Sequence, residues 1–184
     1  MLDLRIKYKH LEDAMNAFGD KVVADAKQNL KERKKVDTGQ LEKSVVNNGV
    51  KFSKRSMTLN ISMSDYGAFI DKGVRGVGGV RLTTSSFKRT NNKGKLWKQN
   101  GGDSPFSYKK GIKPSVKHFV EWSNKRGLSP YAVRETVYHQ GLKPTYFLRD
   151  AVQDNIKLAP AEIVKAFGLD VESTVRTIIK SNFK

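Results

Sequence analysis

Residues 36–46 read VDTGQLEKSVV, and the pattern of apolar residues changes across them. Before this stretch, from about residue 10 to 33, apolar residues recur at steps of three and four, which predicts a long amphipathic helix. After it, residues 44–53 and 57–64 read as the two strands of a β-hairpin, because Leu59, Ile61 and Met63 alternate with polar residues. The stretch therefore predicts an α+β fold in which a long N-terminal helix leads to a small antiparallel sheet.

The tripeptide Asp-Thr-Gly at residues 37–39 is also found in the catalytic loop of aspartic proteases. That chemistry needs a second carboxylate to share a proton, but the sequence has no second copy of the tripeptide, and a basic run, KERKK, precedes this one. We therefore expect Asp37 or Thr38 to cap a short helical turn that ends near Ser44. Gly39 is expected to let another backbone segment pass closely.

The middle of the chain changes composition. DYGAFIDKG is predicted to form a short helical turn that ends at Gly73 in a left-handed C-cap. Residues 74–113 then form a long polar and basic loop with scattered aromatic residues, which is either mobile or functional. The aromatic residues show no repeat, so we favour a loop that orders against a neighbouring subunit over one that stacks on DNA bases.

The last third reads as helical. Pro114 suits a helix start, and this helix is expected to run to Gly127. Ser129 caps a second helix that ends at Gly141. The pair superficially resembles a helix-turn-helix, although Arg134, His139 and Gln140 are its few base-reading side chains. The segment TYFLRDAVQDNIKL and a final helix capped by Asp170 complete the chain.

The sequence offers no pattern typical of an enzyme, a metal site or a cofactor site. His10, His118 and His139 are too scattered for metal-ligand spacing and are expected to be ordinary helix-surface residues. GVRGVGG lacks the Gly-Lys-Ser/Thr ending of a phosphate loop. A nuclease would need clustered carboxylates, and Asp65 and Asp71 have no obvious partners.

Composition limits the class of protein further. The chain has 184 residues and no cysteine, with 35 basic and 18 acidic residues that give a net charge of +17. This excess favours contact with nucleic acid or with an acidic protein surface. There is no apolar run long enough for a membrane span and no pattern of a secretory signal, so we expect a protein of a reducing cytoplasm without a membrane partner.

Three motifs, VDTGQLEKSV, DYGAFIDKGVRG and YHQGLKPTYFLRDAV, follow one another in an order that resembles the tail-component proteins of long-tailed bacteriophages, also called tail-completion or neck proteins. The resemblance covers residues 10–73 and 140–165. The matching positions of the three motifs are, in order, Asp37, Thr38, Gly39, Leu41 and Ser44; Tyr66, Phe69 and Gly73; and Gly141, Pro144, Phe147, Leu148 and Ala151. Asp71 departs from the pattern, since the family usually has Glu there.

The resemblance implies a single domain, 1–184, with helices packed on a small sheet. Residues 10–73 and 140–184 would form the core shared with the family. Residues 74–139 would be an insertion made of a basic loop, 74–113, and a helix pair, 114–139. Each motif residue is expected to stabilise the fold, with Gly141 ending a helix and with Phe147 and Leu148 entering the core.

The implied function is structural: a virion protein at the head–tail junction, made in the host cytoplasm, in a ring of six or a multiple. Its partners would be connector and tail proteins, and genomic DNA would pass through without sequence-specific contact. The cations expected to face the DNA channel or a neighbouring subunit are Lys31, Arg33, Lys34, Lys35, Arg75, Arg81, Lys88, Arg89, Lys93, Lys95 and Lys98.

A sequence-independent DNA-binding protein is the alternative. It would use the basic insertion as a clamp and the helix pair as a platform. Its affinity for DNA would fall steeply with salt, because each neutralised phosphate releases counterions.

Overall fold

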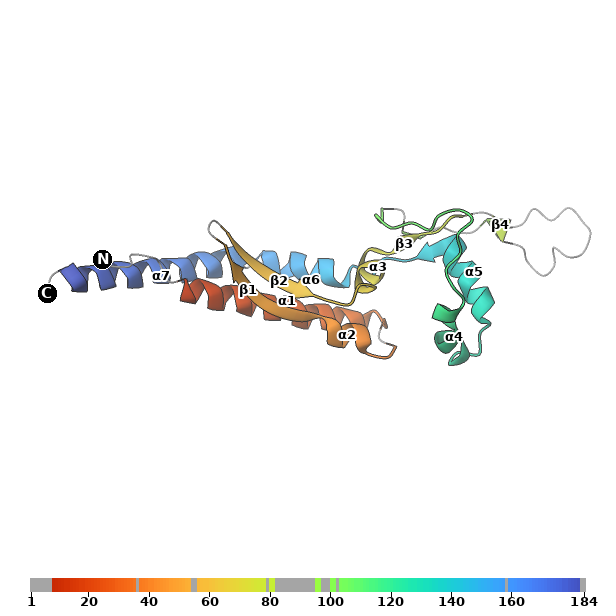
Figure 1. Cartoon of the computed structure of the whole chain (residues 1–184), viewed down its shortest axis with the longest axis horizontal. Helices are drawn as coiled ribbons and strands as arrows, with labels where there is room; N and C mark the ends of the chain where they lie inside the picture. The colour runs from red at the N-terminus through yellow and green to blue at the C-terminus, as the bar shows by residue number, and fades with distance from the viewer. Residues whose placement is uncertain are drawn as a thin grey trace, which may run out of the picture. The chain divides into compact units, whose positions relative to one another are not determined.

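The computed structural model describes residues 8–35, 37–53, 56–78, 80–81, 95–96, 100–101, 103–157 and 159–182. It shows an α+β chain, as predicted (Figure 1). The chain divides into two compact units, which we call unit 1 (Met1–Ser64 and Phe147–Lys184) and unit 2 (Asp65–Tyr146). Unit 2 thus extends beyond both limits of the insertion expected at residues 74–139.

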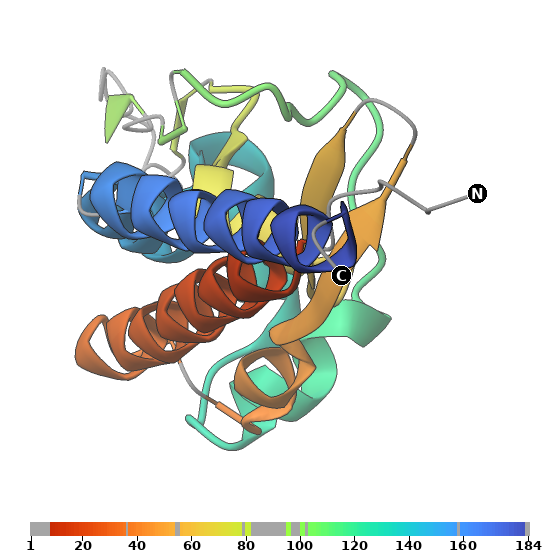
Figure 2. The same ribbon diagram turned by 90° about the vertical axis from the view of Figure 1, so that its left-hand side faces the viewer.

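Unit 1 is built around a long first helix. Its elements are α1 (Lys9–Glu32), α2 (Gln40–Ser44), β1 (Val46–Phe52), β2 (Met57–Ser62), α6 (Phe147–Ile156) and α7 (Ala159–Asn182). Figures 1 and 2 show α6 and α7 alongside α1, with the antiparallel β1–β2 hairpin also packed on α1. The predicted helix and hairpin are therefore confirmed, with boundaries that shift by one or two residues.

The core of unit 1 forms where α1 meets these elements. Val22, Ala26 and Leu30 on α1 are fully buried, as are Val45 before the hairpin and Phe147 at the start of α6. Full burial of a Leu- or Phe-sized side chain stabilises a fold by roughly 1.5–3 kcal/mol. The predicted apolar face of α1 is therefore the centre of this unit.

Gly19 lets the hairpin approach α1. A Cβ at residue 19 would lie 2.7 Å from Nδ2 of Asn47 and 3.0 Å from Cδ1 of Leu59. The Asn47 amide in turn donates hydrogen bonds to the Asn16 carbonyl, at 3.2 Å, and to Asp20 Oδ1, at 3.0 Å. The glycine that lowers helix propensity thus makes room for the polar contact that joins hairpin and helix.

Asp170 does not begin a helix, contrary to the prediction. It lies inside α7, which runs without a break from Ala159 to Asn182, and its side chain is buried. The carboxylate accepts hydrogen bonds from the backbone N–H groups of His10, at 3.0 Å, and Leu11, at 2.9 Å. These are free N–H groups of the first turn of α1, so Asp170 caps a helix that is distant in the sequence.

Unit 2 contains short elements. They are α3 (Gly67–Lys72), β3 (Val74–Arg75), β4 (Val80–Arg81), β5 (Lys95–Leu96), α4 (Lys117–Asn124), α5 (Pro130–Gln140) and β6 (Gly141–Leu142). Strand β3 pairs with β6, and β4 pairs with β5, both in antiparallel fashion.

The helix pair of unit 2 differs in part from the prediction. Helix α4 begins at Lys117 rather than at Pro114, with Val116 as its N-cap residue. Helix α5 begins where predicted, with Ser129 at the N-cap and Pro130 in the first turn, and Gly141 is its C-cap residue. The Ser129 side chain makes no capping hydrogen bond, contrary to the prediction.

Replacing Asp170 with alanine should lower the free energy of unfolding by about 1–3 kcal/mol, because two N–H groups at the start of α1 lose a charged acceptor. Urea unfolding followed by circular dichroism measures the change. Glu172→Ala is the matched control on the same helix, since it removes an exposed ion pair with Arg176 that contributes about 0.3–0.5 kcal/mol. Equal losses in the two variants would contradict the capping role of Asp170.

Candidate functional site

The Asp-Thr-Gly stretch forms a turn between α1 and α2. The N-cap residue of α2 is Gly39, in the left-handed conformation at φ +75°, so the N-cap residue itself has no side chain to cap the helix. The Thr38 hydroxyl is 3.4 Å from the Gln40 N–H, and Asp37 is exposed. A Cβ on Gly39 would meet no atom within 4 Å. The prediction for Thr38 is confirmed, because its hydroxyl accepts a hydrogen bond from the first N–H of α2. The prediction for Gly39 is wrong: its positive φ favours glycine, and no segment passes closely.

Leu41 and Ser44 secure this turn to the rest of unit 1. Leu41 is buried, and the Ser44 hydroxyl donates to the Leu41 carbonyl at 2.8 Å. The same hydroxyl accepts a hydrogen bond from the Ser64 N–H, which follows β2, at 3.0 Å. Ser44 therefore joins the two ends of the hairpin, a structural role like the one expected.

The basic run at the end of α1 is partly neutralised. Lys31 pairs with Glu42 of α2 at 3.0 Å, and Arg33 pairs with Asp150 of α6 at 2.8 Å. Lys34, at φ +53°, lies just after the C-cap of α1, and the Lys35 N–H bonds back to the Leu30 carbonyl. Of these four predicted cations, two thus hold elements of unit 1 together, while Lys34 and Lys35 are exposed.

The arginine partners of Asp150 lower the pKa of its carboxyl group. Partial burial by itself would raise the pKa of Asp150, but hydrogen bonds from Arg33 and Arg149, with their positive charges, outweigh burial and hold that pKa below its ordinary value. The ion pair therefore stabilises unit 1 while Asp150 is ionised.

The second motif forms α3 and one wall of a pocket in unit 2. Tyr66 is the N-cap residue of α3, and Phe69 lies on the helix. Helix α3 ends at Gly73, as predicted, but the residue adopts φ +72° and ψ −177°. This is an extended conformation that is almost restricted to glycine, rather than the left-handed helical one.

The segment that follows α5 and β6 closes the end of α3. The Thr145 N–H bonds to the carbonyls of Ile70 and Asp71 at 3.1 Å, and its hydroxyl donates to the Ile70 carbonyl at 2.8 Å. The Tyr146 N–H bonds to the Asp71 carbonyl at 2.8 Å. The second and third motifs, some 70 residues apart, therefore meet at the C-terminus of α3.

Four glycines allow the backbones of unit 2 to pack at this joint. A Cβ at Gly73 would lie 2.5 Å from the Leu142 carbonyl oxygen, and one at Gly101 would lie 2.7 Å from the carbonyl carbon of Val74. A Cβ at Gly76 would overlap the His139 carbonyl oxygen, and one at Gly141 would overlap that of Val74. We call these residues the glycine joint. Gly76 and Gly101 were missed, because close backbone approach leaves no signal in a Gly-rich loop.

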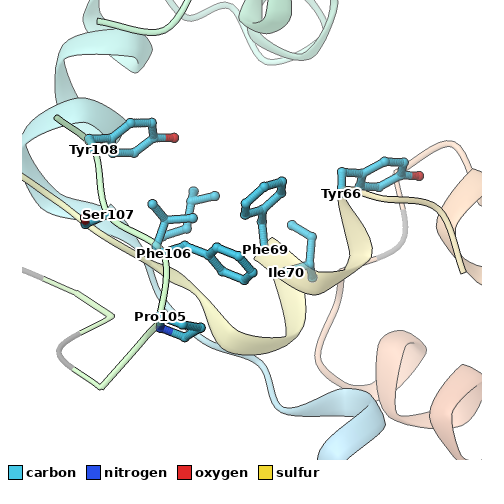
Figure 3. Close-up of a pocket in the computed structure, with 9 residues that line it drawn as sticks. Tyr66, Phe69, Ile70, Pro105, Phe106, Ser107 and Tyr108 are labelled. Carbon is cyan, nitrogen blue, oxygen red and sulfur yellow. The ribbon is translucent and has the colours of Figure 1, made fainter. Parts of the chain in front are cut away.

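The pocket of unit 2 lies between α3 and residues 105–108 and has a volume of about 540 Å³ (Figure 3). Phe69 and Phe106 point toward each other, with ring centroids 4.6 Å apart in an edge-to-face arrangement. Burial raises the pKa of the Tyr108 hydroxyl above its ordinary value. The lining has no charged residue: Tyr66, Phe69, Ile70, Val74, Pro105, Phe106, Ser107, Tyr108 and Leu142.

Part of the predicted long loop is held in place by hydrogen bonds to the backbone around β3. Residues 103–108 lie beside β3 in space. The Ser104 hydroxyl donates to the Gly73 carbonyl, just before β3, at 2.7 Å. Ser107 forms a parallel bridge with Arg75, whose N–H bonds to the Phe106 carbonyl while its carbonyl accepts from the Tyr108 N–H. This segment therefore lies beside β3, next to the β3–β6 sheet.

The third motif crosses from unit 2 to unit 1 between Tyr146 and Phe147. Phe147 and Ala151 are buried in unit 1, as expected for Phe147, whereas Leu148 is half-buried. Pro144 is half-buried in unit 2.

Two of the three predicted base-reading residues of α5, Arg134 and His139, make side-chain contacts within unit 2, while Gln140 accepts a hydrogen bond from the Asn100 N–H through its backbone carbonyl. Arg134 pairs with Glu135 at 2.7 Å, and Lys113 pairs with the same carboxylate at 2.9 Å. His139 Nδ1 lies 2.6 Å from the Gly78 carbonyl oxygen, so this histidine is not an ordinary surface residue as predicted. These contacts leave α5 poorly suited to reading bases.

The other predicted cations are described by the structure to different extents. Arg75 is exposed on β3. The side chains of Arg81 and Lys95 are not described, although their backbones pair in β4 and β5. Lys88, Arg89, Lys93 and Lys98 lie outside the described residues.

Positive charge is concentrated in the range of unit 2. Residues 65–146 contain 16 basic and 5 acidic residues, a net charge of +11, while the rest of the chain contains 19 and 13, a net charge of +6. The two values add up to the total of +17. Most of the excess positive charge of the sequence therefore falls within the range of unit 2.

Two kinds of feature are missing from the described residues. Within them, no three His, Cys, Asp or Glu side chains are grouped so that they could hold a metal ion. No helix in the same part of the chain has the length and apolar character needed to cross a membrane.

The chain matches no model of a known protein family, no curated protein and no solved structure.

Replacing Gly76 with alanine should destabilise unit 2 by at least about 2 kcal/mol, because the backbone of α5 cannot move away from the new methyl group. Gly168→Ala is the control, since its Cβ would meet no atom within 4 Å, and alanine inside a helix should stabilise α7 by about 0.5–1 kcal/mol. Urea unfolding followed by tryptophan fluorescence reports on unit 2, which contains Trp97 and Trp122, and circular dichroism reports on the helices. An unchanged free energy of unfolding in Gly76→Ala would contradict the close backbone packing at the glycine joint.

The Arg33–Asp150 pair should make unit 1 sensitive to acid. Since the pKa of Asp150 is lower in the folded chain than in the unfolded one, the stability it adds is present above about pH 4 and is lost as the pH falls through the folded pKa. Unfolding measured from about pH 6 to about pH 3 should show a smaller acid-induced loss in Asp150→Asn than in the natural chain. The exposed Asp154→Asn should keep the full loss, and identical profiles for all three chains would contradict this assignment.

Proposed function

We propose that this chain is a structural virion protein of a long-tailed bacteriophage, and that it assembles at the head–tail junction as part of a ring around the DNA channel. The observation that carries the proposal is the order of the three motifs, together with the positions of their residues at joints of the fold. Leu41, Phe147 and Ala151 are buried, and Gly73 and Gly141 belong to the glycine joint. Such residues preserve an architecture, which is what an assembly protein needs.

Exposed apolar side chains on α7 further support a role in assembly. Val164 is 69% exposed, Val175 48% and Ile179 52%. Exposed apolar surface of this kind is typical of protein–protein contacts, and head-to-tail contacts that close on themselves generate rings. A ring of six or a multiple, neighbouring connector and tail proteins, and a location in the virion neck after assembly in the host cytoplasm belong to the same proposal.

Sequence-independent DNA binding is the second candidate, and the net charge of +11 in residues 65–146 favours it. Two exposed aromatic residues there lie near arginines: the Arg126 guanidinium is 4.3 Å from the centre of the Trp122 ring, and that of Arg134 is 5.7 Å from the centre of the Tyr131 ring. Aromatic and basic side chains of this kind bind nucleic acid without reading its sequence.

Disrupting this gene in the parent phage tests the first proposal. Negative-stain microscopy of the lysate should show DNA-filled heads beside unjoined tails, or tails with defective upper ends, and a plasmid copy of the gene should restore joined particles. Normal joined particles without the gene would refute a role at the neck.

The purified chain separates the second candidate from the first. Anisotropy of a labelled DNA duplex should show an affinity that falls steeply between about 50 and about 200 mM salt if DNA binding is the main activity. Joined particles without the gene, together with such binding, would establish the DNA-binding protein instead.

A further inference from the structure

Ser107 presents an open strand edge beside the aromatic pocket of unit 2. Arg75 uses its N–H and its carbonyl to bond the Phe106 carbonyl and the Tyr108 N–H. Since backbone groups alternate in direction along an extended segment, the N–H and carbonyl of Ser107 point away from β3. Within the described residues they have no hydrogen-bond partner, and Ser107 is exposed. An extended peptide can therefore add to this edge as a further strand.

The pocket beside that edge suits a large apolar side chain. The pocket has a volume of about 540 Å³ and is lined by aromatic and aliphatic residues. Hydroxyl groups are the only polar side-chain groups of this lining. A base needs a flat ring face for stacking, but Phe69 and Phe106 meet edge to face, and the Tyr108 ring is tilted against that of Tyr138 at a centroid distance of 6.1 Å. The rings thus form walls, which favour an apolar anchor over a stacked base.

The surroundings of the pocket are mainly cationic. Two exposed acidic residues, Asp65 and Asp103, lie within two positions of a lining residue. Five exposed basic residues lie within the same distance along the chain: Lys72, Arg75, Lys109, Lys110 and Lys143. Charge complementarity therefore favours an acidic partner.

We propose that the Ser107 edge and the pocket of unit 2 together bind an extended, acidic peptide segment of a partner protein, with one large apolar side chain of that segment in the pocket. Hydrogen bonds to Ser107 would hold the peptide backbone, the pocket would select the anchor, and the lysines would attract the acidic residues. The inference rests on unit 2 alone and goes beyond the proposed role at the neck.

A random peptide library displayed against the immobilised full-length chain tests the site. Enriched peptides should share one large aromatic or aliphatic residue flanked by Asp and Glu. The best of them, made with a fluorescent label, should bind the chain in anisotropy titrations. Replacing its anchor with alanine should weaken binding about tenfold or more, as expected at a buried hot spot.

Matched variants of the chain locate the binding. Ser107→Pro removes the edge N–H and should weaken peptide binding about tenfold, whereas Ser107→Ala keeps that N–H and should bind normally. Phe69→Ala should also weaken binding, while Tyr131→Ala, which removes an exposed aromatic ring outside the pocket, should not. Circular dichroism of each variant verifies that the helices are intact.

Four results would overturn the inference. The enriched peptides could lack an acidic flank or an apolar anchor, or Ser107→Pro and Phe69→Ala could both bind as the natural chain does. A labelled thymidine 20-mer that competes with the peptide, and that loses affinity in Phe69→Ala, would assign the pocket to single-stranded DNA. Self-association that is lost in the pocket variants, with no peptide enriched, would assign it to a second copy. The lysate experiment does not depend on any of these results, so the two proposals can fail separately.

Discussion

Unit 2 depends on backbone segments that lie closer together than side chains permit. At Gly73, Gly76, Gly101 and Gly141, the space of a Cβ is occupied by a carbonyl group or peptide of a neighbouring segment. This close packing lets β3 pair with β6 on one side and with residues 106–108 on the other. The aromatic pocket follows from that arrangement, because α3 and the Phe106 segment are both anchored to the ends of β3.

Unit 1 is organised differently, by a long helix fixed at several points along its length. Asp170 caps the start of α1, and Asn47 joins the hairpin to the middle of α1. Near its end, the Asn29 amide donates to the Phe147 carbonyl, and Arg33 reaches Asp150. The contacts of Asp170, Asn29 and Arg33 are partly buried, where an unpaired polar group costs free energy, so they fix the positions of elements that apolar burial alone would leave free to slide.

These contacts change the meaning of the basic composition. In the sequence, the cations at the end of α1 suggested a binding surface. In the structure, two of them form ion pairs, and the other two are exposed at the end of the helix. Residues 65–146 hold most of the excess charge. A net positive charge favours contact with acidic molecules in general. It does not indicate where, because an arginine beside a carboxylate and a free arginine read alike in a sequence.

The sequence by itself determined the α+β class, the long first helix, the hairpin, and the helix ends at Gly73 and Gly141, because hydrophobic period and glycine positions act locally. It also singled out Leu41 and Phe147, which are buried. Only the tertiary structure decided that Asp170 caps α1, that Gly76 and Gly101 permit close packing, that Arg33 pairs with Asp150, and that Phe106 lines a pocket with Phe69. The physical reason is that these contacts join residues from 25 to about 160 positions apart, and a local pattern holds no record of which distant atoms fill the space around a residue.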